Sequence, residues 1–79
     1  MVRLVSVTVP GGGERAGEVL AILRDRCSHV HGVTHLAGPV DSVIQFKAVE
    51  KHISATMLQL ERIGVGIDFG SIDILALQV

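Results

Sequence analysis

The order in which two apolar periodicities follow one another constrains this chain more than any other feature. Apolar residues alternate, as in a strand, over Val2–Val9, and then recur three and four residues apart, as in a helix, over Ala16–Cys27. Four segments follow. Val30–Ala37 and Val43–Ala48 have the strand pattern, Val49–Ile63 has the helix pattern, and Ile67–Val79 again has the strand pattern. The predicted order of elements is therefore βαββαβ.

This order predicts an α+β domain of the ferredoxin-like class, in which one four-stranded antiparallel sheet carries two helices on one face. The expected strand order is 4-1-3-2. Alternation should point one face of the first and third strands toward the helices, with side chains Val5, Val7, Val9, Ile44, Phe46 and Ala48. The helices should supply the stripes Ala16, Val19, Leu20, Leu23, Cys27 and Val49, Ile53, Met57, Leu60, Ile63.

The chain of 79 residues is predicted to form a single domain, residues 1–79, because this length holds one hydrophobic core. Its formal net charge of −1 and its dispersed basic residues argue against a nucleic-acid partner. No apolar run approaches the ~20 residues of a membrane-spanning helix, and the start does not fit a signal peptide. We therefore expect a cytoplasmic domain. Because the sequence ends inside the strand pattern Leu77–Val79, we also expect a fragment of a longer protein.

The last strand predicts an apolar surface on the uncovered face of the sheet. If Ile72 and Ile74 face the helices, the alternate residues of that strand fall on the opposite face. The apolar side chains expected there are Leu4, Val43, Leu75 and Leu77. A patch of this kind is typical of an interaction site, so we expect a homo-oligomer or docking to another domain. Scattered exposed aliphatic residues are the alternative.

Gly11, Gly12 and Gly13 join the first strand to the first helix and open the pattern G-x-G-x-x-A, which ends at Ala16. A dinucleotide-binding turn would occupy this position. However, the second strand ends without an acidic residue to hold a ribose, and Glu14 would lie beside the pyrophosphate. We therefore favour a flexible turn. Binding of a small anionic ligand at these glycines is the alternative, because free backbone N–H groups point outward at a helix N-terminus.

Cys27, His29 and His31 are the candidate metal ligands. In a strand His29 and His31 would lie about 7 Å apart on one face, whereas His31 and His35 would be about 13 Å apart. A tetrahedral site needs three or four converging ligands, and Cys27 could approach only through the connecting turn. We therefore favour an exposed histidine cluster, with a metal site or a pH sensor as alternatives. His52 is expected to be exposed on the second helix.

Catalytic chemistry is not predicted. No serine, nor Cys27, has a base at a recognisable spacing, and the acidic residues do not form a pair. Sheet-face RNA binding would require aromatic side chains that the first and third strands do not offer on their open face. Copper-chaperone chemistry would require a C-x-x-C loop, whereas the chain has one cysteine. No cofactor is expected.

Three segments, Leu4–Pro10, Gly32–Gly38 and Gly64–Ile72, resemble the N-terminal cytosolic domain of a family of bacterial, archaeal and plant membrane proteins. That family is described as conserved hydrophobic proteins with a domain of unknown function. The resemblance implies a soluble ferredoxin-like domain that precedes transmembrane helices, so contact with a membrane would come only through a missing downstream segment. A weaker similarity to ACT-type ligand-sensing domains implies pairing through sheets and a glycine at the first strand-to-helix turn.

Taken together, the sequence predicts a non-catalytic regulatory or assembly module of a membrane protein. It would self-associate through the sheet face or an edge and sense a small-molecule ligand. The alternative is a metal- or pH-responsive domain that uses His29 and His31.

Overall fold

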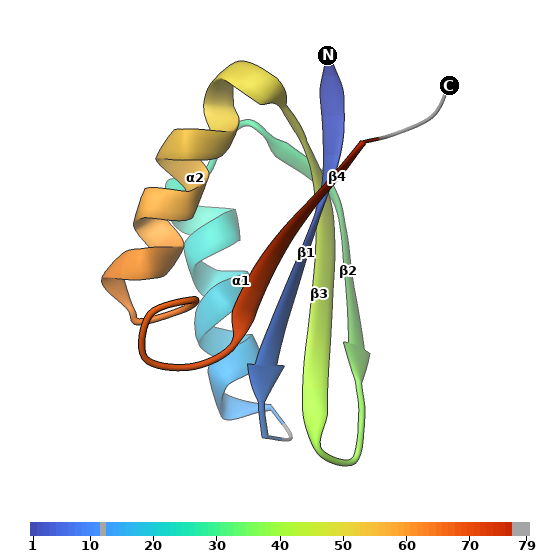
Figure 1. Ribbon diagram of the computed structural model, residues 1–79, viewed down its shortest axis with the longest axis vertical. Coiled ribbons are helices and arrows are strands. Elements are labelled where there is room, and N and C mark those ends of the chain that lie inside the picture. The colour runs from blue at the N-terminus through green and yellow to red at the C-terminus, as the bar shows by residue number, and fades with distance from the viewer. Residues whose placement is uncertain (12, 77–79) are drawn as a thin grey trace.

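The fold predicted from the periodicities is confirmed by a computed structural model, which describes residues 1–11 and 13–76. The elements are β1 (Val2–Pro10), α1 (Glu14–Arg26), β2 (Val30–Ala37), β3 (Asp41–Val49), α2 (Glu50–Arg62) and β4 (Ser71–Ala76). The sheet has the order β2-β3-β1-β4 with antiparallel neighbours, which is the predicted order viewed from its other edge. Both helices cover the same face of this sheet (Figure 1).

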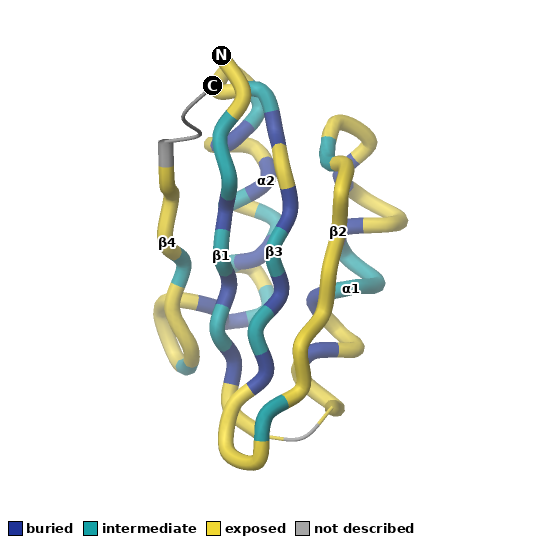
Figure 2. The backbone as a smooth tube through the Cα atoms, turned by 90° about the vertical axis from the view of Figure 1, so that its right-hand side faces the viewer, coloured by how far each residue is buried: buried dark blue, intermediate teal, exposed yellow. Residues whose placement is uncertain are grey.

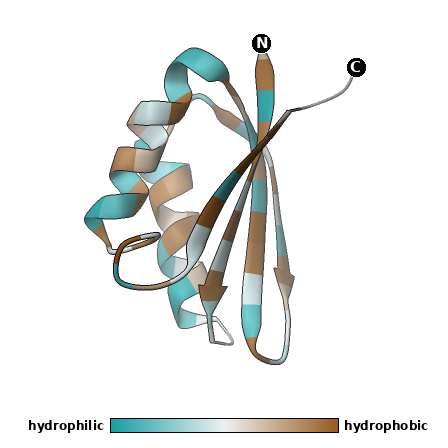
Figure 3. Ribbon diagram, viewed as in Figure 1, coloured by the Kyte–Doolittle hydropathy of each residue, from teal (hydrophilic) through white to brown (hydrophobic). Residues whose placement is uncertain are grey.

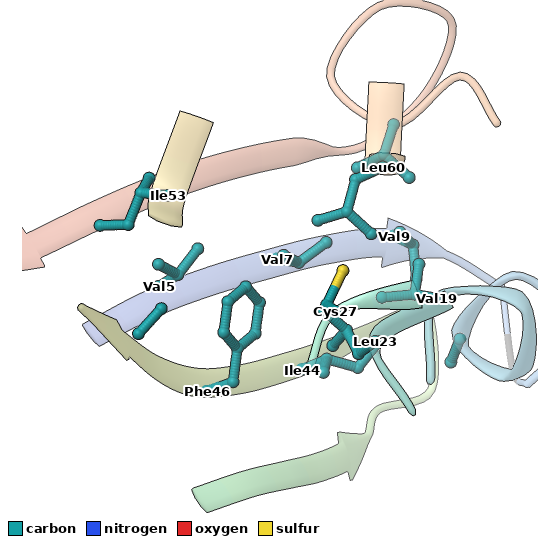
Figure 4. Packing of buried hydrophobic residues seen from close by; sticks show 13 residues of the cluster. Val5, Val7, Val9, Val19, Leu23, Cys27, Ile44, Phe46, Ile53 and Leu60 are labelled. Atoms are coloured by element: carbon teal, nitrogen blue, oxygen red, sulfur yellow. The ribbon is translucent and has the colours of Figure 1, made fainter. Parts of the chain in front are cut away.

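The core lies between the helices and the two central strands. Burial alternates along β1 and β3, as expected for strands that are covered on one face only (Figure 2). Figure 4 shows how side chains from both helices meet those of β1 and β3. The buried apolar residues are Val5, Val7, Val9, Ala16, Val19, Leu23, Cys27, Ile44, Phe46, Ala48, Ile53, Leu60 and Val65. Leu20, Met57 and Ile63, predicted for the core, are partly buried at its border.

β2 differs from the other strands because a β-bulge divides it. His31 pairs with Lys47 and Thr34 pairs with Gln45, so Gly32 and Val33 together oppose a single residue of β3. Gly32 has φ 61°, a left-handed conformation that a glycine adopts without steric cost. The extra residue shifts the alternation, so that the two halves of β2 no longer follow one pattern.

The loop from residue 64 to residue 70 corrects the predicted start of the last strand. β4 begins at Ser71, not at residue 67 or 68. The carbonyl oxygen of Gly64 accepts hydrogen bonds from the N–H groups of residues 67–69 at 2.8–3.2 Å, which closes a compact loop. Glycines with positive φ, Gly64 and Gly70, turn the chain at its two ends. The alternation seen in the sequence therefore continues into a segment that is not a strand.

The same loop also packs onto the helix layer. Val65 is fully buried, and the Arg15 guanidinium of α1 lies 4.1 Å from the centre of the Phe69 ring. Phe69, which strand alternation with Leu75 would place on the open face of the sheet, is partly buried and packs against the core instead. None of the helices among the described residues is long and apolar enough to cross a membrane.

Candidate functional site

The three candidate metal ligands do not converge on one point: Cys27 and His29 line the same pocket, whereas His31 lies elsewhere, in β2. Cys27 follows α1 and lies in the core, with 8% of its surface exposed (Figure 4). His29 lies in the turn before β2, and His31 lies in β2 opposite Lys47. The 7 Å spacing does not apply, because the strand begins only at Val30. In residues 1–11 and 13–76, no three His, Cys, Asp or Glu side chains form a group that could hold a metal ion.

His29 instead stacks on His52. The two ring centres are 3.7 Å apart and the ring planes differ by 4°. His52 is the third residue of α2, so the stack joins the α1–β2 turn to the start of the second helix. The sequence does not predict this pair, because residue spacing carries no information about a contact between two different elements.

A small pocket lies beside the stacked pair. We call it the histidine pocket; it has a volume of about 90 Å³ and is lined by Arg26, Cys27, Ser28, His29, His52, Ala55, Thr56 and Gln59. Loss of hydration, and then the charges of His29 and Lys51, lower the pKa of His52. Burial raises the pKa of the Cys27 thiol, and the Thr56 hydroxyl opposes this in part. The pocket therefore disfavours both a thiolate and additional positive charge.

The glycine turn is held to the β2–β3 connection. Gly11 donates its N–H to the carbonyl of Val40 at 2.9 Å and accepts a hydrogen bond from the Ser42 hydroxyl at 3.1 Å. Gly13 precedes α1, which has no side-chain cap, and Gly12 lies outside the described residues. A Cβ at Gly11 or Gly13 would meet nothing within 4 Å, so no neighbouring atom excludes a side chain at either position.

The open face of the sheet carries two apolar pairs that are separated by a polar row. Leu4 pairs with Leu75 near one end, and Val43 pairs with Leu36 near the other. Between them, paired positions on all four strands form one row, from β2 to β4: Thr34, Gln45, Ser6 and Asp73. The predicted interface residues thus share a face without forming one patch. Leu77, the fourth of them, lies outside the described residues.

The two sheet edges differ in charge. β2 has the sequence VHGVTHLA, which contains no Asp, Glu, Lys or Arg, and seven of its eight residues are exposed. β4 carries Asp73 near its middle, visible as a hydrophilic interruption of a hydrophobic strand (Figure 3). Natural sheet edges are commonly protected from pairing by charged side chains, prolines or bulges. β4 has such a charge, whereas β2 has only its bulge.

Exposed apolar side chains accompany the β2 edge. Leu36 is 74% exposed and Val40, in the following turn, is 72% exposed. Val33, at the bulge, borders a groove of about 520 Å³ between α1 and β2. The apolar lining of this groove consists of Leu20, Leu23, Cys27, Val30 and Val33. α1 therefore does not close over β2, and this strand is accessible from both faces (Figure 2).

No family model matches this chain, and no curated protein or solved structure matches it either.

Proposed function

We propose that this domain is a non-catalytic assembly module, in which the free edge of β2 pairs with β2 of a second copy. The observation that carries the proposal is an uncharged edge strand, exposed along nearly its whole length. A strand of this kind presents a row of unpaired backbone groups, which another strand can satisfy. The segment after the bulge, Thr34–Ala37, offers a regular stretch for such pairing.

The polar row favours an edge over the sheet face as the site of self-association. Face-to-face packing would bury Asp73, together with the amide of Gln45 and the hydroxyls of Ser6 and Thr34. Burying such groups without new hydrogen bonds costs roughly 1–3 kcal/mol each, and more for a charge. Edge pairing leaves the whole row in water and uses only backbone hydrogen bonds.

Symmetry favours pairing of β2 with β2 of a second copy over pairing of β2 with β4 of a second copy. A β2–β4 contact between copies joins different surfaces and propagates into an open filament, whereas a β2–β2 contact about a two-fold axis closes after two copies. In a β4–β4 contact, moreover, two Asp73 carboxylates would approach one another across the seam. The proposed assembly is therefore a closed dimer with a continuous sheet.

The wider setting of the module is part of the same proposal. The likeness of Leu4–Pro10, Gly32–Gly38 and Gly64–Ile72 to the cytosolic domain of a membrane-protein family supports a regulatory domain at the cytoplasmic face of a membrane. The likeness to ACT-type domains supports the sensing of a small ligand, which would bias the equilibrium between free and paired copies. The Gly11–Gly13 turn is the ligand position that this likeness suggests.

The substitution Leu36→Lys tests the β2 edge. The side chain is 74% exposed, so the change leaves the core intact, while a lysine on the edge opposes pairing. We expect the dimer dissociation constant, from sedimentation over a range of protein concentrations, to rise at least about tenfold, or ~1.4 kcal/mol.

Leu75→Lys is the matched control, because it introduces the same charge at a 48% exposed leucine of the opposite edge strand. We expect it to associate as the wild type does. A wild type that stays monomeric at high micromolar concentration would refute the proposal. Dissociation by Leu75→Lys with no effect of Leu36→Lys would also refute it.

A second candidate function, a pH-responsive domain, is favoured by the stack of His29 on His52. Protonation of both rings would place two positive charges against one another, and so would loosen the contact between the α1–β2 turn and α2. Acid-induced exposure of this junction, measured by the imidazole resonances of the two residues, would support it.

A further inference from the structure

The histidine pocket has the chemistry of an anion site. Six of its lining side chains can donate hydrogen bonds from a guanidinium, a hydroxyl, an imidazole or an amide: Arg26, Ser28, His29, His52, Thr56 and Gln59. The Thr56 hydroxyl already donates to the backbone carbonyl of His52 at 3.0 Å. The lining includes neither Asp nor Glu. A bound anion would thus meet donors from α1, the α1–β2 turn and α2, whereas a cation would find no carboxylate.

The surroundings strengthen this preference. Lys51 precedes His52 on α2 and contributes to the lowered pKa of that histidine. The nearest acidic residues along the chain are engaged elsewhere: Asp25 pairs with Arg24 and Glu50 pairs with Arg3, both at 3.2 Å. The basic side chains near the pocket come from α1, the following turn and α2. No carboxylate in the pocket lining competes with an anion for them.

The size of the pocket limits the ligand to a small ion. Its volume of about 90 Å³ is well above the ~15 Å³ that one water molecule requires. It is far below the roughly 300–1,000 Å³ typical of sites for drug-sized molecules. A free inorganic oxyanion fits these bounds.

We propose that the histidine pocket binds a small inorganic oxyanion, such as sulfate or phosphate, between the α1–β2 turn and the start of α2. A bound anion stabilises positive charge on an imidazole beside it, so binding takes up protons and tightens as the pH falls. This site is distinct from the β2 edge, and the proposal stands whether or not two copies pair. It also differs from a metal site, because no three His, Cys, Asp or Glu side chains of residues 1–11 and 13–76 form a group that could hold a metal ion.

Sulfate is the probe, because its charge does not change over the range in which histidine titrates. It is titrated into the protein at pH about 5.5 and about 8, on either side of the ordinary histidine pKa of about 6.5, while the imidazole NMR resonances are recorded. We expect saturable shifts of the His29 and His52 resonances, with an affinity at least tenfold higher at the lower pH.

His29→Gln tests the assignment. This residue is exposed in a turn, so the variant should fold, and we expect its sulfate affinity at the lower pH to fall at least tenfold. His31→Gln is the matched control, since it removes an exposed histidine from the opposite, open face of the sheet, and it should bind sulfate as the wild type does. The proposal is overturned by the absence of saturable shifts, by an equal loss in both variants, or by Zn²⁺ saturating the pocket where sulfate does not.

Discussion

Gly70 and Gly17 show how differently two glycines of one chain are constrained. Gly70 connects the 64–70 loop to β4 with φ 68°, and a Cβ there would collide with the carbonyl oxygen of Thr8 in β1. Gly17 lies in the first half of α1, exposed, and a Cβ there would meet nothing within 4 Å. The first glycine is required by its neighbour, whereas the second only weakens a helix.

The substitution of each by alanine should therefore change stability in opposite directions. We expect Gly70→Ala to lower the free energy of unfolding by about 2–4 kcal/mol, through strained backbone and a steric clash. Gly17→Ala should raise it by roughly 0.5–1 kcal/mol, since alanine favours the helix. Urea denaturation measures both, and a stable Gly70→Ala variant would show that the loop does not hold β4 against β1.

The histidines illustrate at the same scale what the sequence could and could not predict. Three histidines within seven residues suggested a cluster, but this rested on placing His29 inside a strand. His29 lies one residue before β2 and stacks on His52, which is 23 positions later in the chain. Because this contact is created by the packing of α2 against the end of α1, no local spacing could have revealed it.

Among the elements, β2 is the one whose irregularity has the largest consequence. The bulge places Gly32 and Val33 opposite Phe46, and His31 and His35 consequently lie on opposite faces of the sheet. A bulge twists an edge strand and hinders its pairing with another strand. We infer that this bulge limits how tightly two β2 strands can associate.

Deletion of Val33 tests this inference. It removes the extra residue, so that Gly32 alone opposes Phe46, while every residue after it keeps its partner in β3. We expect the variant to fold and its dimer dissociation constant to fall severalfold, as measured by sedimentation. A folded variant whose association is unchanged or weaker would show that the bulge does not limit pairing.

The boundaries of the elements were predictable only where a chemical stop accompanied the pattern. β2 has the predicted bounds, Val30–Ala37, because a Gly-Pro sequence follows it. β4 was predicted to start several residues too early. Alternating apolar residues also occur in the 64–70 loop, whose hydrogen bonds to the carbonyl of Gly64 replace a strand ladder.

At the scale of the whole molecule, the order of periodicities was sufficient to predict the fold and most of the core. The core faces of β1 and β3 followed directly from alternation, as Val7 and Ile44 show. The polar row from Thr34 to Asp73 did not follow, because it depends on which residues stand side by side on four strands. Alternation identifies a face, whereas register decides whether the apolar residues on that face form one surface.

The most direct test of β2 pairing is amide hydrogen exchange at low and high protein concentration. We expect the amides of Thr34–Ala37 that point away from β3 to become protected as the concentration rises, while the amides of β4 keep their exchange rates. Protection that appears in β4 instead, or a dimer in which the outward amides of β2 still exchange freely, would contradict it.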